Sequence, residues 1–146
     1  MKYIKSELKD GFDLAEIRAL AMKPSLEAIN RYDSNRVRDR FLDTFEPDET
    51  YKIIESDELL GFYVTRERKD HIYLDHLYIK PEHQNKKLGK VVLDKIIQTA
   101  KASDLPVRLC ALKGSRSNDF YLKNGFKKTH ESEFDIFYVY SITKAS

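Results

Sequence analysis

The chain has 146 residues, a length typical of one domain. Its 26 Lys and Arg residues nearly balance 24 acidic residues, which argues against a dedicated nucleic-acid-binding protein. A single cysteine excludes an intramolecular disulfide and a cysteine-rich zinc site. No apolar run approaches the roughly 18 residues that span a bilayer, and the start of the chain lacks the apolar segment of a secretory signal. We therefore expect one soluble, cytoplasmic domain over residues 1–146, with no membrane or nucleic-acid partner and no metal.

The first third of the chain is expected to be mainly helical, after a short strand over residues 2–8. Apolar residues at helical spacing predict a first helix that begins at Asp13, which is its expected N-cap. Pro24 predicts a kink or break in that helix. A second helix is predicted over residues 34–45, with Ser34 as its cap.

The rest of the chain alternates between strand and helix patterns. Strands are predicted over residues 51–54, 60–65, 71–80, 107–112, 126–129 and 134–142, and helices over residues 88–102 and 115–124. The strand–helix–strand unit around residues 88–102 predicts a parallel strand pair. Because the preceding strands form an antiparallel meander, the predicted fold is a mixed α/β sheet rather than a doubly wound parallel one.

The first segment that indicates chemistry lies where a predicted strand leads through a short loop into a helix. Four lysines against one glutamate (4 − 1) give residues 80–90 a charge of +3, whereas the whole chain carries +2. The first turn of a helix offers unpaired N–H groups and a partial positive charge, which together favour a phosphate. The segment is therefore either a polyphosphate site or a solvated basic helix start.

The second segment, residues 114–126, is a predicted helix that carries Phe-Tyr near its end and stops at Gly125. Tyr121 is either an amphipathic core residue or a functional side chain beside a ligand. Asn118 precedes it by three residues and falls on the same helix face.

Together the two segments resemble the GNAT superfamily of acyl-CoA-dependent N-acyltransferases. Residues 84–89, Gln-Asn-Lys-Lys-Leu-Gly, are similar to the motif Gln/Arg-x-x-Gly-x-Gly/Ala of that family. Residues 118–126, Asn-Asp-Phe-Tyr-Leu-Lys-Asn-Gly-Phe, are similar to its Asn-x-x-Phe-Tyr-x-x-x-Gly-Phe segment, with one residue fewer after the asparagine. Lys87 replaces the first glycine of the loop, where glycine permits a close backbone approach to the ligand. The resemblance extends over most of the chain and implies a GNAT-like fold of about six to seven strands and four helices.

The resemblance implies that acetyl-CoA lies between two parallel strands, here residues 71–80 and 107–112, with its pantetheine arm paired to the first strand. The pyrophosphate would then meet the lysine-rich loop and the start of the following helix. The cofactor-binding residues implied in this way are Leu77, Tyr78, Ile79, Gln84, Asn85, Lys86, Lys87, Leu88, Gly89, Lys90, Asn118 and Tyr121.

The implied reaction is direct attack of an amine on the thioester of acetyl-CoA. The resemblance assigns Tyr121 as the acid that protonates the leaving thiolate. The attacking amine needs a proton acceptor, and the candidates are Asp75 and His76, which are neighbours on one strand and point to opposite faces. Another group or solvent is the remaining alternative.

In this family the first two helices largely select the acceptor, here an amine of a small molecule or a peptide. The polar residues of this region are Glu27, Arg31, Tyr32, Arg36, Arg38 and Arg40. The arginines among them either bind an acceptor carboxylate or belong to a solvated helix face. Cys110 is expected to be buried and inert. The aromatic-rich residues 134–140 form either core or a homodimer interface.

Three functions remain open at this stage. The first is an acetyl-CoA-dependent N-acetyltransferase, which the two motifs favour. The second is a non-catalytic acyl-CoA-binding or sensing module, favoured by Lys87 and the uncertain base. The third is a nucleic-acid-binding domain that uses the lysine-rich loop, and the balanced net charge disfavours it.

Overall fold

The computed structural model describes residues 1–84 and 86–142. The α-helices and strands in these residues are β1 (Lys2–Lys5), α1 (Gly11–Glu27), α2 (Ser34–Leu42), β2 (Thr50–Glu55), β3 (Glu58–Glu67), β4 (Ile72–Ile79), α3 (Leu88–Ala102), β5 (Val107–Leu112), α4 (Arg116–Lys123), β6 (Lys127–Glu131) and β7 (Asp135–Tyr140). Short 3-10 helices cover Leu8–Asp10, Pro47–Glu49 and Pro81–His83.

The strands pair in the order β1-β2-β3-β4-β5-β7-β6. Four α-helices accompany these seven strands in the described part of the chain, which confirms the predicted mixed α/β sheet. None of the helices in residues 1–84 and 86–142 is both long and apolar enough to cross a membrane.

The chain folds as two compact units. The first consists of Met1–Val64 and His76–Gly89, and the second of Thr65–Asp75 and Lys90–Ser146. β3 and β4 contribute residues to both units. That residues 1–146 form one domain stays a prediction.

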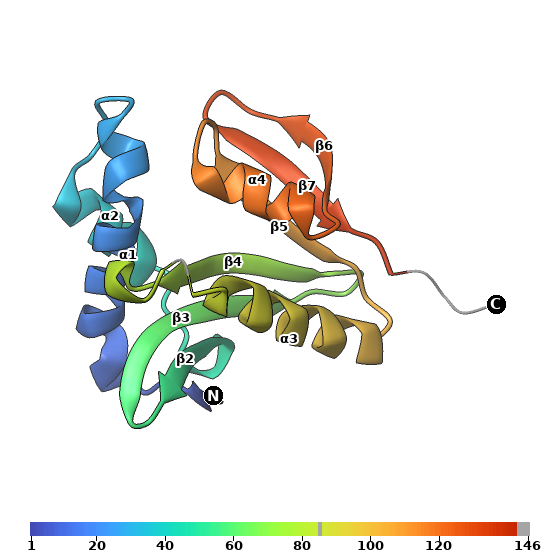
Figure 1. Cartoon of the computed structure of the whole chain (residues 1–146), viewed down its shortest axis with the longest axis horizontal. Coiled ribbons are helices and arrows are strands. Elements are labelled where there is room, and N and C mark those ends of the chain that lie inside the picture. Colours follow the sequence, from blue (N-terminus) through green and yellow to red (C-terminus); the bar gives the residue numbers. More distant parts are fainter. Residues whose placement is uncertain (85, 143–146) are drawn as a thin grey trace. The chain divides into compact units, whose positions relative to one another are not determined.

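The core of the first unit forms where α1 and α2 meet the strands. α1 and α2 lie side by side (Figure 1), and Leu14 and Ile17 of α1 join Phe41 of α2 in one buried cluster with Phe62 and Val64 of β3. The rings of Phe41 and Phe62 meet edge to face with centroids 5.1 Å apart. Fully burying one such side chain stabilises the folded state by about 1.5–3 kcal/mol, so this cluster fixes both helices on β3.

The boundaries of α1 differ from those predicted. The helix begins at Gly11 because a 3-10 turn leads directly into it, and the Asp10 carboxylate accepts a hydrogen bond of 2.8 Å from the Glu7 backbone N–H. Asp13 is therefore inside the first turn, and its prediction as N-cap is wrong. Of the kink or break predicted at Pro24, the break is wrong, since the helix continues through Pro24 to Glu27, and the kink stays a prediction.

The start of α2 corrects a second cap. Asp33, rather than Ser34, is the N-cap, and its carboxylate accepts from the backbone N–H groups of Asn35 and Arg36. Both residues are chemically suited to this position. The chain enters the helix one residue earlier than the apolar pattern alone indicated.

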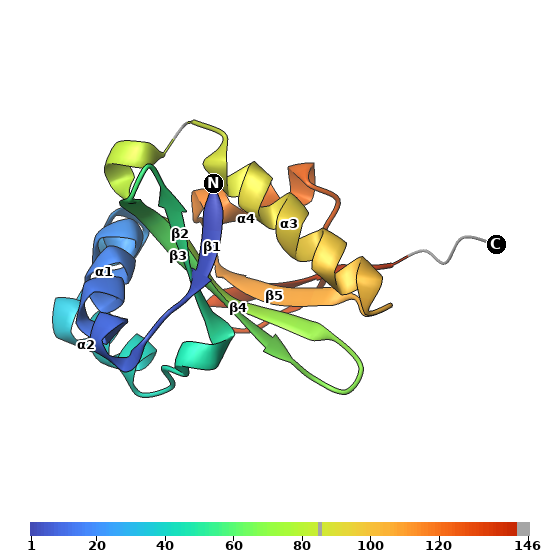
Figure 2. The same ribbon diagram turned by 90° about the horizontal axis from the view of Figure 1, so that it is seen from below.

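The second unit contains the predicted parallel strand pair. β4 pairs with β5 in parallel, Ile72 with Val107 and Tyr73 with Arg108. β7 then pairs antiparallel with both β5 and β6, and Figure 2 shows β5 close to α3. α3 has the predicted bounds and buries Val92, Leu93, Ile96, Ile97 and Ala100, whereas Val91 is half exposed.

Within the first unit, β3 and β4 approach each other very closely at Gly61. A Cβ atom on Gly61 would lie 2.1 Å from the Tyr78 carbonyl oxygen and 3.0 Å from the Ile79 Cα. Both atoms belong to the backbone, so neither can rotate away. Glycine at position 61 is therefore what allows β4 to run in this place.

We expect Gly61→Ala to destabilise the protein by about 2 kcal/mol or more, because the added methyl group forces the backbone apart. For a chain of this size the melting temperature should fall by about 4 °C or more. The matched control is Gly114→Ala: a Cβ there meets nothing within 4 Å, although its φ of +80° carries a cost of its own. Thermal unfolding that shows no larger loss for Gly61→Ala than for Gly114→Ala would contradict this interpretation.

Candidate active site

The carboxyl end of β4 carries the three residues expected to bind the pantetheine arm. Leu77, Tyr78 and Ile79 are partly buried. Beyond them the Lys80 N–H donates to the Leu60 carbonyl at 2.9 Å, and Gln84 Nε2 donates to the Ile79 carbonyl at 3.0 Å. The first residue of the loop motif thus fixes the end of the strand that precedes it.

The lysine-rich loop follows from this point. His83 Nε2 lies 2.9 Å from Glu58 Oε1, which ties the loop back to the start of β3. Lys86 and Lys87 are exposed, and the Lys90 ammonium forms an exposed ion pair of 3.0 Å with Asp94. The structure therefore presents positive charge at the loop. Asn85, which the sequence also assigns to the cofactor, lies outside the described residues.

Lys87 occupies the position where the similar motif has glycine, and it takes a conformation that glycine adopts readily. Its φ is +59°, in the left-handed region, which costs a residue with a Cβ roughly 1–2 kcal/mol. α3 begins at the next residue, Leu88. The chain thus keeps a left-handed turn at the entry of α3 with a lysine side chain at that point.

In the second unit, the amide of Asn118 joins β5, α4 and β7. Nδ2 donates to the carbonyl oxygens of Leu112 at 2.8 Å and Ser115 at 3.0 Å, while Oδ1 accepts from the Tyr138 hydroxyl at 2.7 Å. Burial raises the pKa of Tyr138, so its hydroxyl remains a donor at neutral pH. These contacts give Asn118 a structural task in holding the β5–α4 connection.

Tyr121 lies on the buried face of α4 and exposes 8% of its surface. Its ring packs against Phe126, with centroids 5.4 Å apart, and near Tyr138 at 6.4 Å. As predicted, α4 stops at Gly125, whose φ is +90°, and the Phe126 N–H returns to the Tyr121 carbonyl. The end of the helix thus fixes the ring of Tyr121. This agrees both with a core residue and with a functional side chain beside a ligand.

The two candidate bases on β4 have different surroundings. The Asp75 carboxylate lies 2.9 Å from Arg66 Nε in a mostly buried ion pair of the second unit. His76 exposes 7% of its surface and packs edge to face on Phe41 in the first unit. Its Nδ1 lies 3.2 Å from the Tyr78 hydroxyl.

A buried arginine of α1 completes this polar cluster, and the sequence analysis missed it. Arg18 exposes 5% of its surface, donates from Nε to the Tyr78 hydroxyl at 3.2 Å and donates from Nη1 to the Val37 carbonyl. The available signal was its position four residues after Leu14, which places a charged residue on the apolar face of α1.

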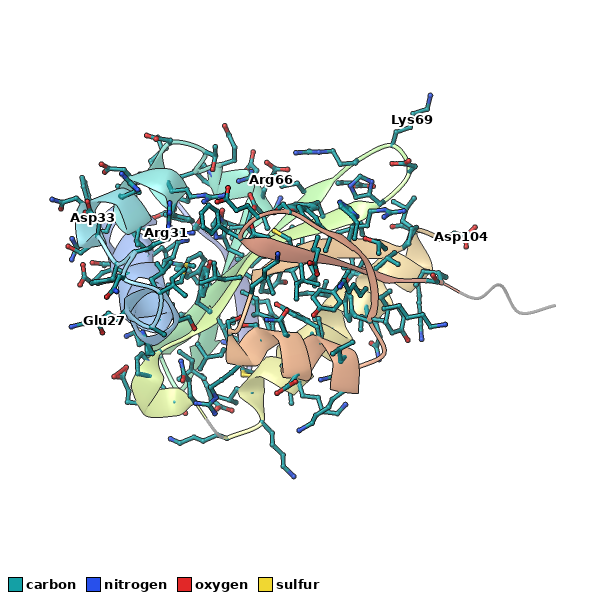
Figure 3. The ribbon with its side chains drawn as sticks, turned by 90° about the horizontal axis from the view of Figure 1, so that it is seen from above. Glu27, Arg31, Asp33, Arg66, Lys69 and Asp104 are labelled. Atoms are coloured by element: carbon teal, nitrogen blue, oxygen red, sulfur yellow. The ribbon has the colours of Figure 1, made fainter. Side chains whose placement is uncertain are left out.

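The arginines that the sequence analysis considered for acceptor binding differ from Arg18, because they lie on the surface. Arg31 stands near the connection that leads from α1 to α2, between Glu27 and Asp33 in the chain (Figure 3), and all three are exposed. Arg38 forms a two-pronged ion pair with Glu16, at 2.7 and 3.3 Å, and this contact lowers the pKa of the Glu16 carboxyl. Arg38 thus joins the two helices.

Cys110 differs from its predicted environment. The thiol is only partly buried, and the Tyr73 hydroxyl donates to it at 3.5 Å. Burial, with this contact, raises the pKa of Tyr73, so the phenol remains protonated. The expectation that Cys110 is buried is therefore wrong, and its inertness stays a prediction.

The fold as a whole is similar to solved structures that include two N-acetyltransferases. The PaiA N-acetyltransferase from Thermoplasma acidophilum, in complex with coenzyme A, is 21% identical and superposes with a TM-score of 0.75 over 96% of this chain and 98% of that one. The ribosomal-protein-S18-alanine N-acetyltransferase from Escherichia coli is 14% identical, with a TM-score of 0.74 over 99% and 96% of the two chains. PH1933 from Pyrococcus horikoshii OT3 is 18% identical, with a TM-score of 0.73 over 99% of each chain.

Sequence comparisons add the family. No curated protein matches this sequence significantly. The model of the acetyltransferase (GNAT) family matches residues 14–126, which include both motifs and all of β2 to α4. The chain therefore belongs to the acetyltransferase (GNAT) family.

Proposed function

We propose that this protein is an acetyl-CoA-dependent N-acetyltransferase that acts on an amine of a small molecule or a peptide. The observation that carries the proposal is the pair of motif segments in a chain of the acetyltransferase family. Residues 84–89 lead from the end of β4 into α3, and residues 118–126 lie in α4 and the turn before β6. The cytoplasmic location and the homodimer interface over residues 134–140 stay predictions.

In this proposal the first unit binds the pantetheine arm and the pyrophosphate of acetyl-CoA. The backbone of Leu77, Tyr78 and Ile79 pairs with the amides of pantetheine, as an added strand would. Lys86 and Lys87 meet the pyrophosphate, with backbone N–H groups at the start of α3. A similar structure holds coenzyme A, which supports this choice of ligand.

The remaining cofactor-binding residues support these groups. Gln84 fixes the Ile79 carbonyl, Leu88 and Gly89 form the first turn of α3, and we keep Asn85 and Lys90 as contacts to the phosphates. Asn118 acts through the connection between β5 and α4, whose carbonyl groups it holds.

The proposed reaction is one acyl transfer. The amine nitrogen forms a bond to the acetyl carbonyl carbon, the carbon–sulfur bond breaks, and coenzyme A leaves as a thiolate. A backbone N–H of β4 stabilises the oxyanion, and the Tyr121 hydroxyl gives its proton to the thiolate sulfur. The proton lost by the amine passes to a base.

Asp75 and His76 remain the proposed alternatives for that base. The Asp75 carboxylate forms an ion pair with Arg66 at 2.9 Å. The Tyr78 hydroxyl can accept the Nδ1–H of His76 while donating to the Met22 sulfur 3.5 Å away.

A non-catalytic acyl-CoA-binding module with the same fold is the second candidate. The observation that favours it is Lys87, which has a left-handed backbone conformation. The similar motif has glycine, and so no side chain, at this position. This candidate shares the cofactor but not the chemical step, so it predicts binding without thiol release.

We expect saturating acetyl-CoA to raise the melting temperature by about 5–10 °C, since a ligand at 100 times its dissociation constant adds about 2.7 kcal/mol of stability. Lys86→Glu should weaken this effect because it repels the phosphates, whereas Lys127→Glu on the exposed strand β6 should leave it unchanged. Differential scanning fluorimetry with the three proteins measures both. A wild type that acetyl-CoA does not stabilise would remove both candidates.

Lys87→Gly should relieve the left-handed conformation and stabilise the protein by about 1 kcal/mol. Because the proposal places the Lys87 ammonium beside the pyrophosphate, the variant should also bind acetyl-CoA more weakly. Lys87→Ala is the control, since it removes the charge but keeps the Cβ. Equal melting temperatures for the Gly and Ala variants would contradict the conformational argument.

Tyr121→Phe should lower kcat by about 10²-fold, the scale of a lost general acid, with little change in the KM for acetyl-CoA. The ring stays packed in α4, so the melting temperature should change little. Tyr140→Phe removes one hydroxyl elsewhere in the same unit and serves as the control. An unchanged kcat for Tyr121→Phe at every pH would exclude the assignment of the acid.

A further inference from the structure

Arg18 is a buried cation that lacks an acidic partner in the described part of the chain. It exposes 5% of its surface, and its contacts within residues 1–84 and 86–142 are the Tyr78 hydroxyl, the Val37 carbonyl and the face of the Tyr78 ring, 6.0 Å from the guanidinium carbon. All of these are neutral. An arginine is rarely buried unless it is paired, because removing its charge from water is costly.

The guanidinium also keeps hydrogen-bonding capacity. Its fork of N–H donors gives one bond through Nε and one through Nη1. No fully buried side-chain nitrogen or oxygen in the described residues lacks a hydrogen-bond partner. The Nη2 end, for which neither contact accounts, is therefore not fully enclosed by protein atoms, and it is the end of the fork that remains for a ligand.

The position of Arg18 connects this donor with the proposed chemistry. Leu14, Arg18 and Met22 follow one another at intervals of four along α1, and the latter two meet the hydroxyl of Tyr78. Tyr78 is the middle residue of the β4 segment proposed to bind pantetheine. The phosphates of the cofactor are assigned to the lysines of the loop, so Arg18 remains for a different anion near the same strand.

We propose that Arg18 binds a carboxylate of the acceptor, so that the substrate is an amine that also carries a carboxylate, such as a free amino acid or a short peptide with an acidic residue at its N-terminus. This inference deepens the proposed function and rests on it. A planar carboxylate matches the two N–H groups of a guanidinium edge and compensates its charge. A polyamine, which brings only positive charge, is disfavoured at this site.

The test uses acceptors in matched pairs. Each standard L-amino acid is compared with its C-terminal amide, and Asp-Ala and Glu-Ala with Asn-Ala and Gln-Ala, by thiol release from acetyl-CoA. The wild type should prefer the carboxylate member in kcat/KM by about tenfold or more, the scale of one charge-assisted pair. The two kinds of pair distinguish a free amino acid from a peptide.

Arg18→Met should abolish this preference, with the amide member retained as a substrate, because it removes the charge but fills a similar volume. Arg18→Lys keeps the charge without the fork and should retain part of the preference. Arg68→Met, at an exposed arginine of a turn, is the control and should leave the ratio unchanged. A carboxylate preference that survives Arg18→Met in a folded protein would show that Arg18 only ties α1 to α2 and β4.

The same panel in thermal shift measurements without any cofactor separates this inference from the proposed function. In one outcome, acetyl-CoA fails to stabilise the wild type, but carboxylates raise its melting temperature more than their amides do, and they have no such effect on Arg18→Met. The proposed acetyltransferase function is then wrong, and the carboxylate site at Arg18 is supported. If acetyl-CoA binds and is turned over but no carboxylate is preferred in either assay, the carboxylate site is wrong and the acetyltransferase stands.

Discussion

The close approach of β4 to β3 is the constraint on which the first unit depends. Only the missing side chain of Gly61 leaves room for the Tyr78 carbonyl oxygen. With the backbone fixed there, the next carbonyl, that of Ile79, meets Gln84, and the Tyr78 hydroxyl meets Arg18. A single glycine thus positions both the backbone proposed to bind the cofactor and the side chain that engages the buried arginine.

Of the features of this unit that cost stability, two lie beside the proposed ligands. Arg18 buries a charge among neutral partners, and Lys87 holds a left-handed φ with a Cβ. Local violations of this kind persist when the surrounding structure enforces them, and they concentrate at functional sites. An anion at each position would offset the cost, which is the physical link between the acetyl-CoA and carboxylate proposals.

The polar residues of the two motif segments have two different roles in the structure. The amides of Gln84 and Asn118 hold backbone carbonyls at the ends of β4 and β5, whereas Lys86 and Lys87 extend into solvent. The resemblance alone assigned all four to the cofactor. In the structure the amides shape the two strand ends, and the lysines carry the charge that a phosphate would meet.

Local pattern by itself determined the mixed α/β fold, the bounds of α3 and β5, and the end of α4 at Gly125, because apolar periodicity and a left-handed stop signal act within one segment. It misplaced the start of α1, because the preceding 3-10 turn decides where that helix begins, and it allowed a break at Pro24 where the helix is continuous. Tertiary structure alone decided that Arg18 is buried, that Arg38 pairs with Glu16 and that Asn118 joins three elements. Those contacts unite residues from separate elements, and no spacing along the chain encodes which side chains will meet.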